Sequence, residues 1–319
     1  MTADRRQQLD SAAIALMVLL CACWGFNQVA IKLANGGISP IFQAGLRSAG
    51  SALLVWAWSA HRGVRLFTRD GTLALGLLIG VLFAGEFVFL YWSLVFTSAS
   101  RAVLFLYMSP FVVALGAHVL IPGERLRWLQ IVGLVCAFAG TVLAFGDALR
   151  FPTYRELVGD GLAFVAALLW GATTVVIKAS RLARIGPHKT LLYQLAVSAI
   201  LLPILSWVAG EPGIVAATPL VLGMLAYQVV VVAFASYLAW FWLISRYPAG
   251  RLSSFSFLTP LFGLVAGALI LGEPVGWALL LALALVGIGI ALVNRPAAPP
   301  HIAPRPASAD AGARSRSGG

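Results

Sequence analysis

The sequence predicts an all-α polytopic membrane protein with ten transmembrane helices, a prediction that rests on its composition and its apolar runs. Of the 319 residues, 61% are hydrophobic and only 10% are charged, against about 25% charged residues in soluble domains. A helix that crosses a hydrocarbon core of about 30 Å needs about 20 residues, so ten crossings take up about 200 residues. The composition therefore excludes a water-soluble fold, and the length leaves no room for a sizeable domain outside the membrane.

Apolar runs, divided by charged or Pro- and Gly-rich breaks, give the expected spans in order. They cover residues 13–34, 40–60, 72–96, 99–121, 128–145, 157–179, 190–209, 219–244, 249–271 and 275–293. Each span is expected to be helical, because a backbone in lipid must satisfy its hydrogen bonds internally. Arg5 and Arg6 before the first run resemble the start of a signal peptide. However, the run continues to Ile31, so we expect a first span that is kept.

The net charge of +11 follows the loops between the spans. With the N-terminus in the cytoplasm, 16 of the 22 Lys and Arg residues lie on the cytoplasmic side, and Arg101, Arg150 and Arg155 lie on the other. The positive-inside rule then predicts that both termini are cytoplasmic. A nucleic-acid partner would need the basic residues on one exposed face. We therefore expect no nucleic acid, and the lipid bilayer and a small-molecule substrate as the partners.

An internal repeat divides the spans into two sets of five. The matches are Trp24-Gly25 with Trp170-Gly171 at an offset of 146, Ser109-Pro110 with Thr259-Pro260 at 150, and Gly123-Glu124 with Gly272-Glu273 at 149. Because five is an odd number, the second copy must enter the membrane from the opposite side. Inverted repeats are the architecture of many secondary transporters, with the substrate site near the midplane between the halves. The repeat therefore predicts transport by alternating access.

Four segments are expected along the chain. They are a cytoplasmic N-terminus (1–12), a first repeat (13–146), a second repeat (147–293) and a cytoplasmic tail (294–319). The tail consists largely of Pro, Ala, Ser, Gly and Arg, a composition that cannot bury enough apolar surface to fold. It is therefore expected to be disordered.

One stretch of the first span reads Cys23-Trp24-Gly25-Phe26-Asn27-Gln28-Val29-Ala30-Ile31-Lys32 and is followed by Pro40 and Arg47. Its counterpart runs from Leu169-Trp170-Gly171 to Lys178. Together with the Ser109-Pro110 and Gly-Glu pairs, this pattern resembles EamA-type members of the drug/metabolite transporter (DMT) superfamily. The resemblance implies two five-helix EamA repeats and a permease of the bacterial inner membrane that moves small metabolites, often amino acids and often outward. A multidrug efflux pump or a passive channel is the alternative.

Two polar helix faces are the first candidates for a substrate site. Residues at i, i+3 and i+4 share one face of a helix, which groups Trp24, Asn27 and Gln28 in the first repeat and Trp170, Thr173 and Thr174 in the second. An aromatic wall with amide and hydroxyl groups suits a half-wet cavity that binds a small polar solute. The alternative is plain helix packing through the neighbouring Gly25 and Gly171.

Glu86 is the only carboxylate deep within an expected span. A charge in that position costs at least a few kcal/mol, so the side chain should face the bundle interior and either pair with a cation or hold a proton. It is a candidate both for proton coupling and for binding a substrate amine, and an interhelical hydrogen bond is the structural alternative. Arg47 is a candidate partner for Glu86 or a cation that reaches outward to the interface. We therefore expect transport to be driven by proton coupling or by exchange of one solute for another.

Pro110 and Pro260 occupy matching positions near the centres of the fourth and ninth expected spans. Each removes one backbone donor and leaves the carbonyl four residues earlier, of Leu106 or Ser256, without its helical partner. Matching interruptions in inverted repeats point to a binding site, which makes the prolines candidate hinges and Ser256 a candidate substrate contact. Static kinks are the alternative, because proline is common in membrane helices.

An enzyme is the least favoured class. The sequence lacks the zinc-protease helix signature and the phosphate-binding loop, so it predicts no metal, no cofactor and no ATP-driven cycle within the chain. Cys21, Cys23 and Cys136 lie inside apolar runs and indicate neither a metal site nor a disulfide framework. The sequence does not determine the oligomeric state.

Overall fold

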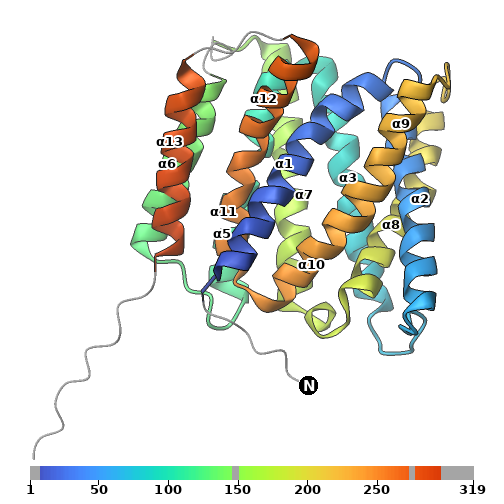
Figure 1. The fold of residues 1–319 in the computed structure, drawn as a ribbon, viewed down its shortest axis with the longest axis horizontal. Coiled ribbons are helices and arrows are strands. Elements are labelled where there is room, and N and C mark those ends of the chain that lie inside the picture. Colours follow the sequence, from blue (N-terminus) through green and yellow to red (C-terminus); the bar gives the residue numbers. More distant parts are fainter. Residues whose placement is uncertain (1–7, 146–150, 273–276, 296–319) are drawn as a thin grey trace, which may run out of the picture.

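The computed structural model describes residues 8–145, 151–272 and 277–295 as a bundle of upright helices (Figure 1). Apart from one isolated bridge between Ile38 and Ile214, these residues contain no β structure. The start of the first helix and the end of the last lie at the same end of the bundle. We call this the terminal end and the opposite one the far end.

The helices follow one another with short connections. Their bounds are α1 (Ser11–Ala34), α2 (Pro40–His61), α3 (Leu73–Phe96), α4 (Ala99–Leu106), α5 (Ser109–Leu120), α6 (Trp128–Ala144), α7 (Tyr154–Ala179), α8 (Pro187–Val208), α9 (Pro219–Tyr227), α10 (Tyr237–Arg246), α11 (Ala249–Ser254), α12 (Leu258–Leu271) and α13 (Ala278–Asn294). A π-helical stretch, Gln228–Ser236, joins α9 to α10, and short 3-10 turns cover Arg181–Arg184 and Phe255–Phe257.

Seven helical runs in the described part of the chain are long and apolar enough to cross a membrane. They are Ser11–Ala34, Leu73–Phe96, Arg101–Leu120, Tyr154–Ala179, Pro187–Val208, Pro219–Arg246 and Ala249–Ile270. Trp128–Ala144 and Ala278–Asn294 are apolar but shorter. The second expected span, 40–60, forms α2, which has 22 residues but is in neither group, because polar side chains such as Gln43, Arg47 and Ser48 lower its hydropathy.

Local sequence determines where several helices begin. The side chain of Asp10 accepts a hydrogen bond from the backbone N–H of Ala13 (2.8 Å), and Thr153 and Glu156 form a reciprocal capping box at the start of α7. Both devices satisfy backbone donors that an α-helix leaves free at its first turn. Prolines at the first turns of α2, α5, α8 and α9 fit there, because those positions need no donor.

Contacts between the two halves of the chain are reciprocal. Helix α1 packs on α12 as α7 packs on α5, and α3 packs on α7 as α1 packs on α9. Two matching glycines show the same correspondence between the halves. A Cβ atom on Gly25 would lie 2.5 Å from the Cβ of Phe262, and one on Gly171 would lie 2.6 Å from the Cβ of Val112. Both glycines therefore allow a close helix crossing, which larger residues would prevent.

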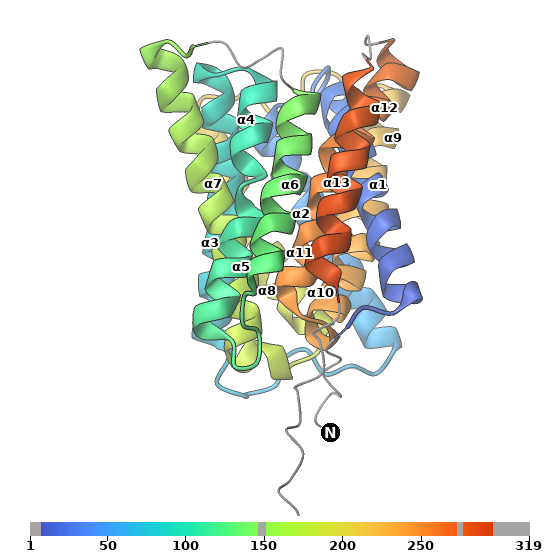
Figure 2. The same cartoon turned by 90° about the vertical axis from the view of Figure 1, so that its left-hand side faces the viewer.

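Helices α6 and α13 run side by side along one edge of the bundle (Figure 2). A Cβ atom on Gly289 would lie 2.5 Å from the carbonyl oxygen of Gly133, so the two backbones touch. Helices α2 and α8 pack against each other at the opposite edge, where Pro203 fits against Gly45. Between these two edges the remaining helices surround a central space.

Candidate functional site

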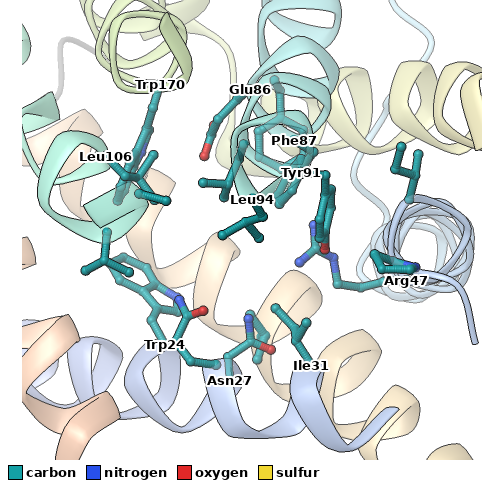
Figure 3. Close-up of a pocket in the computed structure, with 18 of the residues that line it drawn as sticks. Trp24, Asn27, Ile31, Arg47, Glu86, Phe87, Tyr91, Leu94, Leu106 and Trp170 are labelled. Carbon is teal, nitrogen blue, oxygen red and sulfur yellow. The ribbon is translucent and has the colours of Figure 1, made fainter. Parts of the chain in front are cut away.

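A cavity of about 640 Å³ lies among α1, α2, α3, α4, α7 and α10 (Figure 3). Its volume is in the range of small-molecule sites. Seven of the eight candidate substrate contacts from the sequence line it: Trp24, Asn27, Gln28, Glu86, Trp170, Thr173 and Thr174. The two polar faces predicted from helical spacing therefore meet across one space, although they lie 146 residues apart in the chain.

Aromatic contacts fix the position of the two tryptophans. The indole Nε1 of Trp24 donates to the Oγ of Ser236 at 2.8 Å, and its ring lies edge-on to Trp240 with 5.7 Å between centroids. Trp170 makes a similar contact with Tyr107 at 6.2 Å. A hydrogen bond and two ring contacts therefore hold the indole of Trp24, and one ring contact positions that of Trp170, so both side chains contribute to an aromatic wall.

Three residues of the sequence analysis lie elsewhere. Ser256 is buried in the 3-10 turn before α12 and does not line the cavity, whereas Thr259, three residues later, does. Pro110 lies in the first turn of α5 and Pro260 in the first turn of α12, each after an interruption of the helix and neither on the cavity wall.

Glu86 reaches the cavity from α3 with 8% of its surface exposed. It makes no hydrogen bond and no ion pair with any other residue that the structure describes, so the interhelical hydrogen bond considered from the sequence is not seen. Figure 3 shows its carboxyl group directed into the open space between α1 and α3. The group is thus available to a solute or a proton.

Arg47 enters the same cavity from α2. The side chain is only 2% exposed, and its guanidinium lies 4.5 Å from the ring centre of Phe87. Its Nε and Nη2 atoms are buried without a hydrogen-bond partner. Within the described ranges it makes no contact ion pair with Glu86, although the two charges interact electrostatically, and it does not reach outward to the interface.

Several cavity residues were missed by sequence reasoning. Tyr91, Tyr107, Tyr237 and Trp240 line the wall, but aromatic residues in apolar helices give no signal that separates a cavity wall from a packed core. Gln194 also lines it. The internal repeat could have identified this residue, because it occupies the position in α8 that corresponds to Arg47 in α2.

The cavity reaches the far end of the bundle, and toward the terminal end its wall stops at Ile177. Asn35, Ala209 and Glu211, from the far ends of α1 and α8 and the following loop, belong to its wall. At the terminal end, Lys178 and Glu124 lie under it and tie neighbouring helix ends together. Among the described residues, no cluster of three or more His, Cys, Asp or Glu side chains could hold a metal ion.

Comparisons with known proteins agree with this architecture. The model of the EamA-like transporter family matches residues 11–146 and again residues 157–295. The chain is 29% identical over 270 residues to a "Probable amino-acid metabolite efflux pump" of Salmonella typhimurium, covering 81% of this chain and 86% of that one. It is 27% identical over 293 residues to the "Uncharacterized transporter YvbV" of Bacillus subtilis, covering 90% and 93%. A solved crystal structure with 23% identity superposes with a TM-score of 0.77 over 89% of this chain and 98% of that one, a likeness of fold.

Proposed function

We propose that this chain, which belongs to the EamA-like transporter family, exports an amino acid or a related small metabolite by alternating access. Family and relatives make it an integral membrane transporter rather than an enzyme. The substrate class is taken from the names of the relatives in Salmonella typhimurium and Escherichia coli. The site that supports it is the cavity that both halves of the chain line.

The proposed architecture is ten crossings in two inverted five-helix repeats, 13–146 and 147–293. The reciprocal packing of α1 on α12 and of α7 on α5 supports it, because a two-fold axis in the membrane plane produces such pairs of contacts. The segments 1–12 and 294–319 are then cytoplasmic extensions, although residues 1–7 and 296–319 lie outside the described part. The terminal end is assigned to the cytoplasm of a bacterial inner membrane, since the basic loops lie there.

The single observation that carries alternating access is the asymmetry of the cavity. Its wall reaches the far end through Asn35 and Glu211, while Lys178 and Glu124 close the terminal end. A carrier must expose one central site to one side at a time, and this arrangement is that of an outward-open state. A passive channel would need both ends open together.

Roles for the cavity residues follow from their chemistry. Trp24 and Trp170 form the apolar wall for the substrate, and Asn27, Gln28, Thr173 and Thr174 supply hydrogen bonds. Glu86 binds either a substrate amine or a proton, and one replaces the other during the cycle. Pro110 and Pro260 act as hinges where α4 gives way to α5 and the 3-10 turn gives way to α12. Ser256, which is buried away from the cavity, is assigned no contact.

Transport by purified protein in proteoliposomes tests this function. Labelled L-amino acids are offered outside vesicles that hold the same unlabelled compound, and we expect saturable uptake that the internal compound accelerates. Trp24→Ala should reduce it, while Trp56→Ala, a matched change at an exposed side chain of α2, should not. Flux that rises linearly with concentration would indicate a channel, and uptake of dissimilar cationic dyes in place of amino acids would indicate a multidrug pump.

A further inference from the structure

The guanidinium of Arg47 has hydrogen-bond donors with no acceptor. Nε and Nη2 are both buried and unpartnered, and the side chain lies on the wall of the central cavity. Leaving a buried charged donor unsatisfied costs more than leaving a neutral one. An anion that arrives with the substrate would offset this cost by accepting from the two nitrogens.

The surroundings of Arg47 hold its charge in one place. Its guanidinium lies over Phe87, 4.5 Å from the ring centre, an arrangement that restricts the planar group without using any of its donors. Nε and Nη2 form one edge of the group, and once a substrate uncovers it this edge can bind a planar carboxylate through two parallel hydrogen bonds. Glu86 is the chain neighbour of Phe87, so a cationic and an anionic group occupy adjacent parts of one cavity (Figure 3).

We propose that Arg47 binds the carboxylate of a zwitterionic substrate while Glu86 binds its ammonium group. The inference rests on the proposed function and deepens it by naming the form of the substrate, an α-amino acid with a large apolar or aromatic side chain. That side chain lies against Trp24 and Trp170, the aromatic part of the wall. The two fixed charges select a dipolar head group, and the indoles select the side chain.

The two repeats differ at this point, and the difference sets the substrate's orientation. Gln194 stands in α8 where the second repeat would carry a counterpart of Arg47, and it also lines the cavity. An amide cannot replace a guanidinium as a carboxylate partner of equal strength, because the hydrogen bond lacks charge assistance. The carboxylate is therefore held on the side of the first repeat, whichever side of the membrane the cavity faces.

Three compounds of nearly equal size separate the two charges. L-phenylalanine carries both groups, phenethylamine lacks the carboxylate, and 3-phenylpropionate lacks the amine. Their dissociation constants are measured by titration calorimetry on the purified full-length protein in detergent. We expect the wild type to bind L-phenylalanine more tightly than either analogue.

Variants of the two charged residues then separate their contributions to the binding free energy. Arg47→Gln should weaken L-phenylalanine and 3-phenylpropionate about 10- to 100-fold, the range for a lost charged hydrogen bond, and phenethylamine much less. Glu86→Gln should weaken L-phenylalanine and phenethylamine and affect 3-phenylpropionate least. Arg62→Gln is the matched control, because Arg62 ends the same helix and lies over Trp58, 4.8 Å from the ring centre and outside the cavity.

Distinct results overturn the inference. Equal weakening of all three compounds by Arg47→Gln would mean that Arg47 only shapes the cavity, and no binding of L-phenylalanine by the wild type would exclude the substrate class. If Arg47→Gln does not give a monodisperse protein, Arg47→Lys decides, since it keeps the charge but loses the two-pronged geometry and should weaken the two carboxylates selectively. Binding with the expected pattern but without vesicle transport would refute the proposed function alone.

Discussion

Lys178 and Glu124 meet at the terminal end of the bundle, with 3.5 Å between Nζ and Oε1. The same ammonium donates to the carbonyl oxygens of Ile244, at 2.5 Å, and Tyr247 at the end of α10. The second carboxylate oxygen of Glu124 accepts from the backbone N–H of Ala249 at 2.8 Å. One ion pair therefore joins the loop before α6, the end of α7 and the link between α10 and α11 beneath the cavity.

We expect Glu124→Gln to loosen this end, because it removes the charge that Lys178 faces while keeping an acceptor for Ala249. A lost contact of about 0.5–1.5 kcal/mol shifts the balance toward an inward-open form two- to tenfold. The measurement uses Gln28→Cys, an exposed cavity position on α1, and an impermeant maleimide added outside. The rate of labelling should fall in the Glu124→Gln variant. A Lys178→Gln/Glu124→Gln double variant should add little to either single change, and full additivity would show that the two residues act separately.

The proline hinges predict opposite effects in the two halves. Unlike Pro219, these two prolines directly follow another helical segment, α4 or the 3-10 turn. Pro110→Ala and Pro260→Ala each restore a backbone N–H that can bond across that interruption, worth about 0.5–1.5 kcal/mol, and so bias the two open states about two- to tenfold. Because the proposed repeats are inverted, one variant should raise external labelling of Gln28→Cys and the other should lower it. Pro219→Ala, at the first turn of α9 where a helix begins in any case, is the control. Shifts in the same direction, or none, would leave the prolines as static kinks.

Glu86 is expected to take part in the pH dependence of transport. Its carboxyl group faces the cavity without a hydrogen-bond or ion-pair partner among the described residues, so a proton and a substrate amine compete for it. Glu86→Gln keeps the shape of the side chain and should flatten the rate between pH 5 and pH 9. Initial uptake rates into proteoliposomes at each pH give the comparison. A mutant profile like that of the wild type would leave Glu86 with a structural role only.

The orientation in the membrane can be tested at two exposed phenylalanines. Phe67 in the loop after α2 is 82% exposed, and Phe151 before α7 is 98% exposed. In a background without native cysteines, Phe151→Cys should react with an impermeant reagent in intact cells, and Phe67→Cys only after permeabilisation. The reverse pattern would place the termini outside and refute the assignment from the basic loops.

Asp70 and Lys189 form an ion pair between the loop before α3 and the start of α8, with 2.7 Å from Oδ2 to Nζ. Hydrogen bonding to Lys189 holds the pKa of Asp70 well below its ordinary value of 3.8. The pair therefore stabilises the folded protein fully above that ordinary value and progressively less as the pH falls below it. Asp70→Asn should lower Tm by a few degrees at pH 7, and the difference from the wild type should shrink at pH 3. A pH-independent difference would show that the ionised form of Asp70 does not stabilise the fold.

Helical periodicity in the sequence was enough to predict many of the residues that line the cavity. Spacings of three and four residues placed Trp24, Asn27 and Gln28 on one face of their helix, and the repeat offset linked that face to Trp170. Both faces line the cavity in the structure. The family resemblance is confirmed by the family model, which matches both repeats. In contrast, Ser256, a candidate substrate contact because of the proline that follows it, is buried in a 3-10 turn and does not line the cavity.

The sequence by itself determined that the chain is helical and membrane-embedded, because hydropathy and helical periodicity are local properties of the backbone and its solvent. Only the tertiary structure decided where the guanidinium of Arg47 lies and which groups it contacts. Its surroundings come from α2 and α3, whose crossing places the guanidinium over Phe87 and leaves two nitrogens unpartnered. The closed end was equally beyond the sequence, since Lys178 and Glu124 are 54 residues apart and meet only through packing. Burial and pairing of charges depend on which helices meet, and helix crossings are set by side-chain packing across the whole bundle.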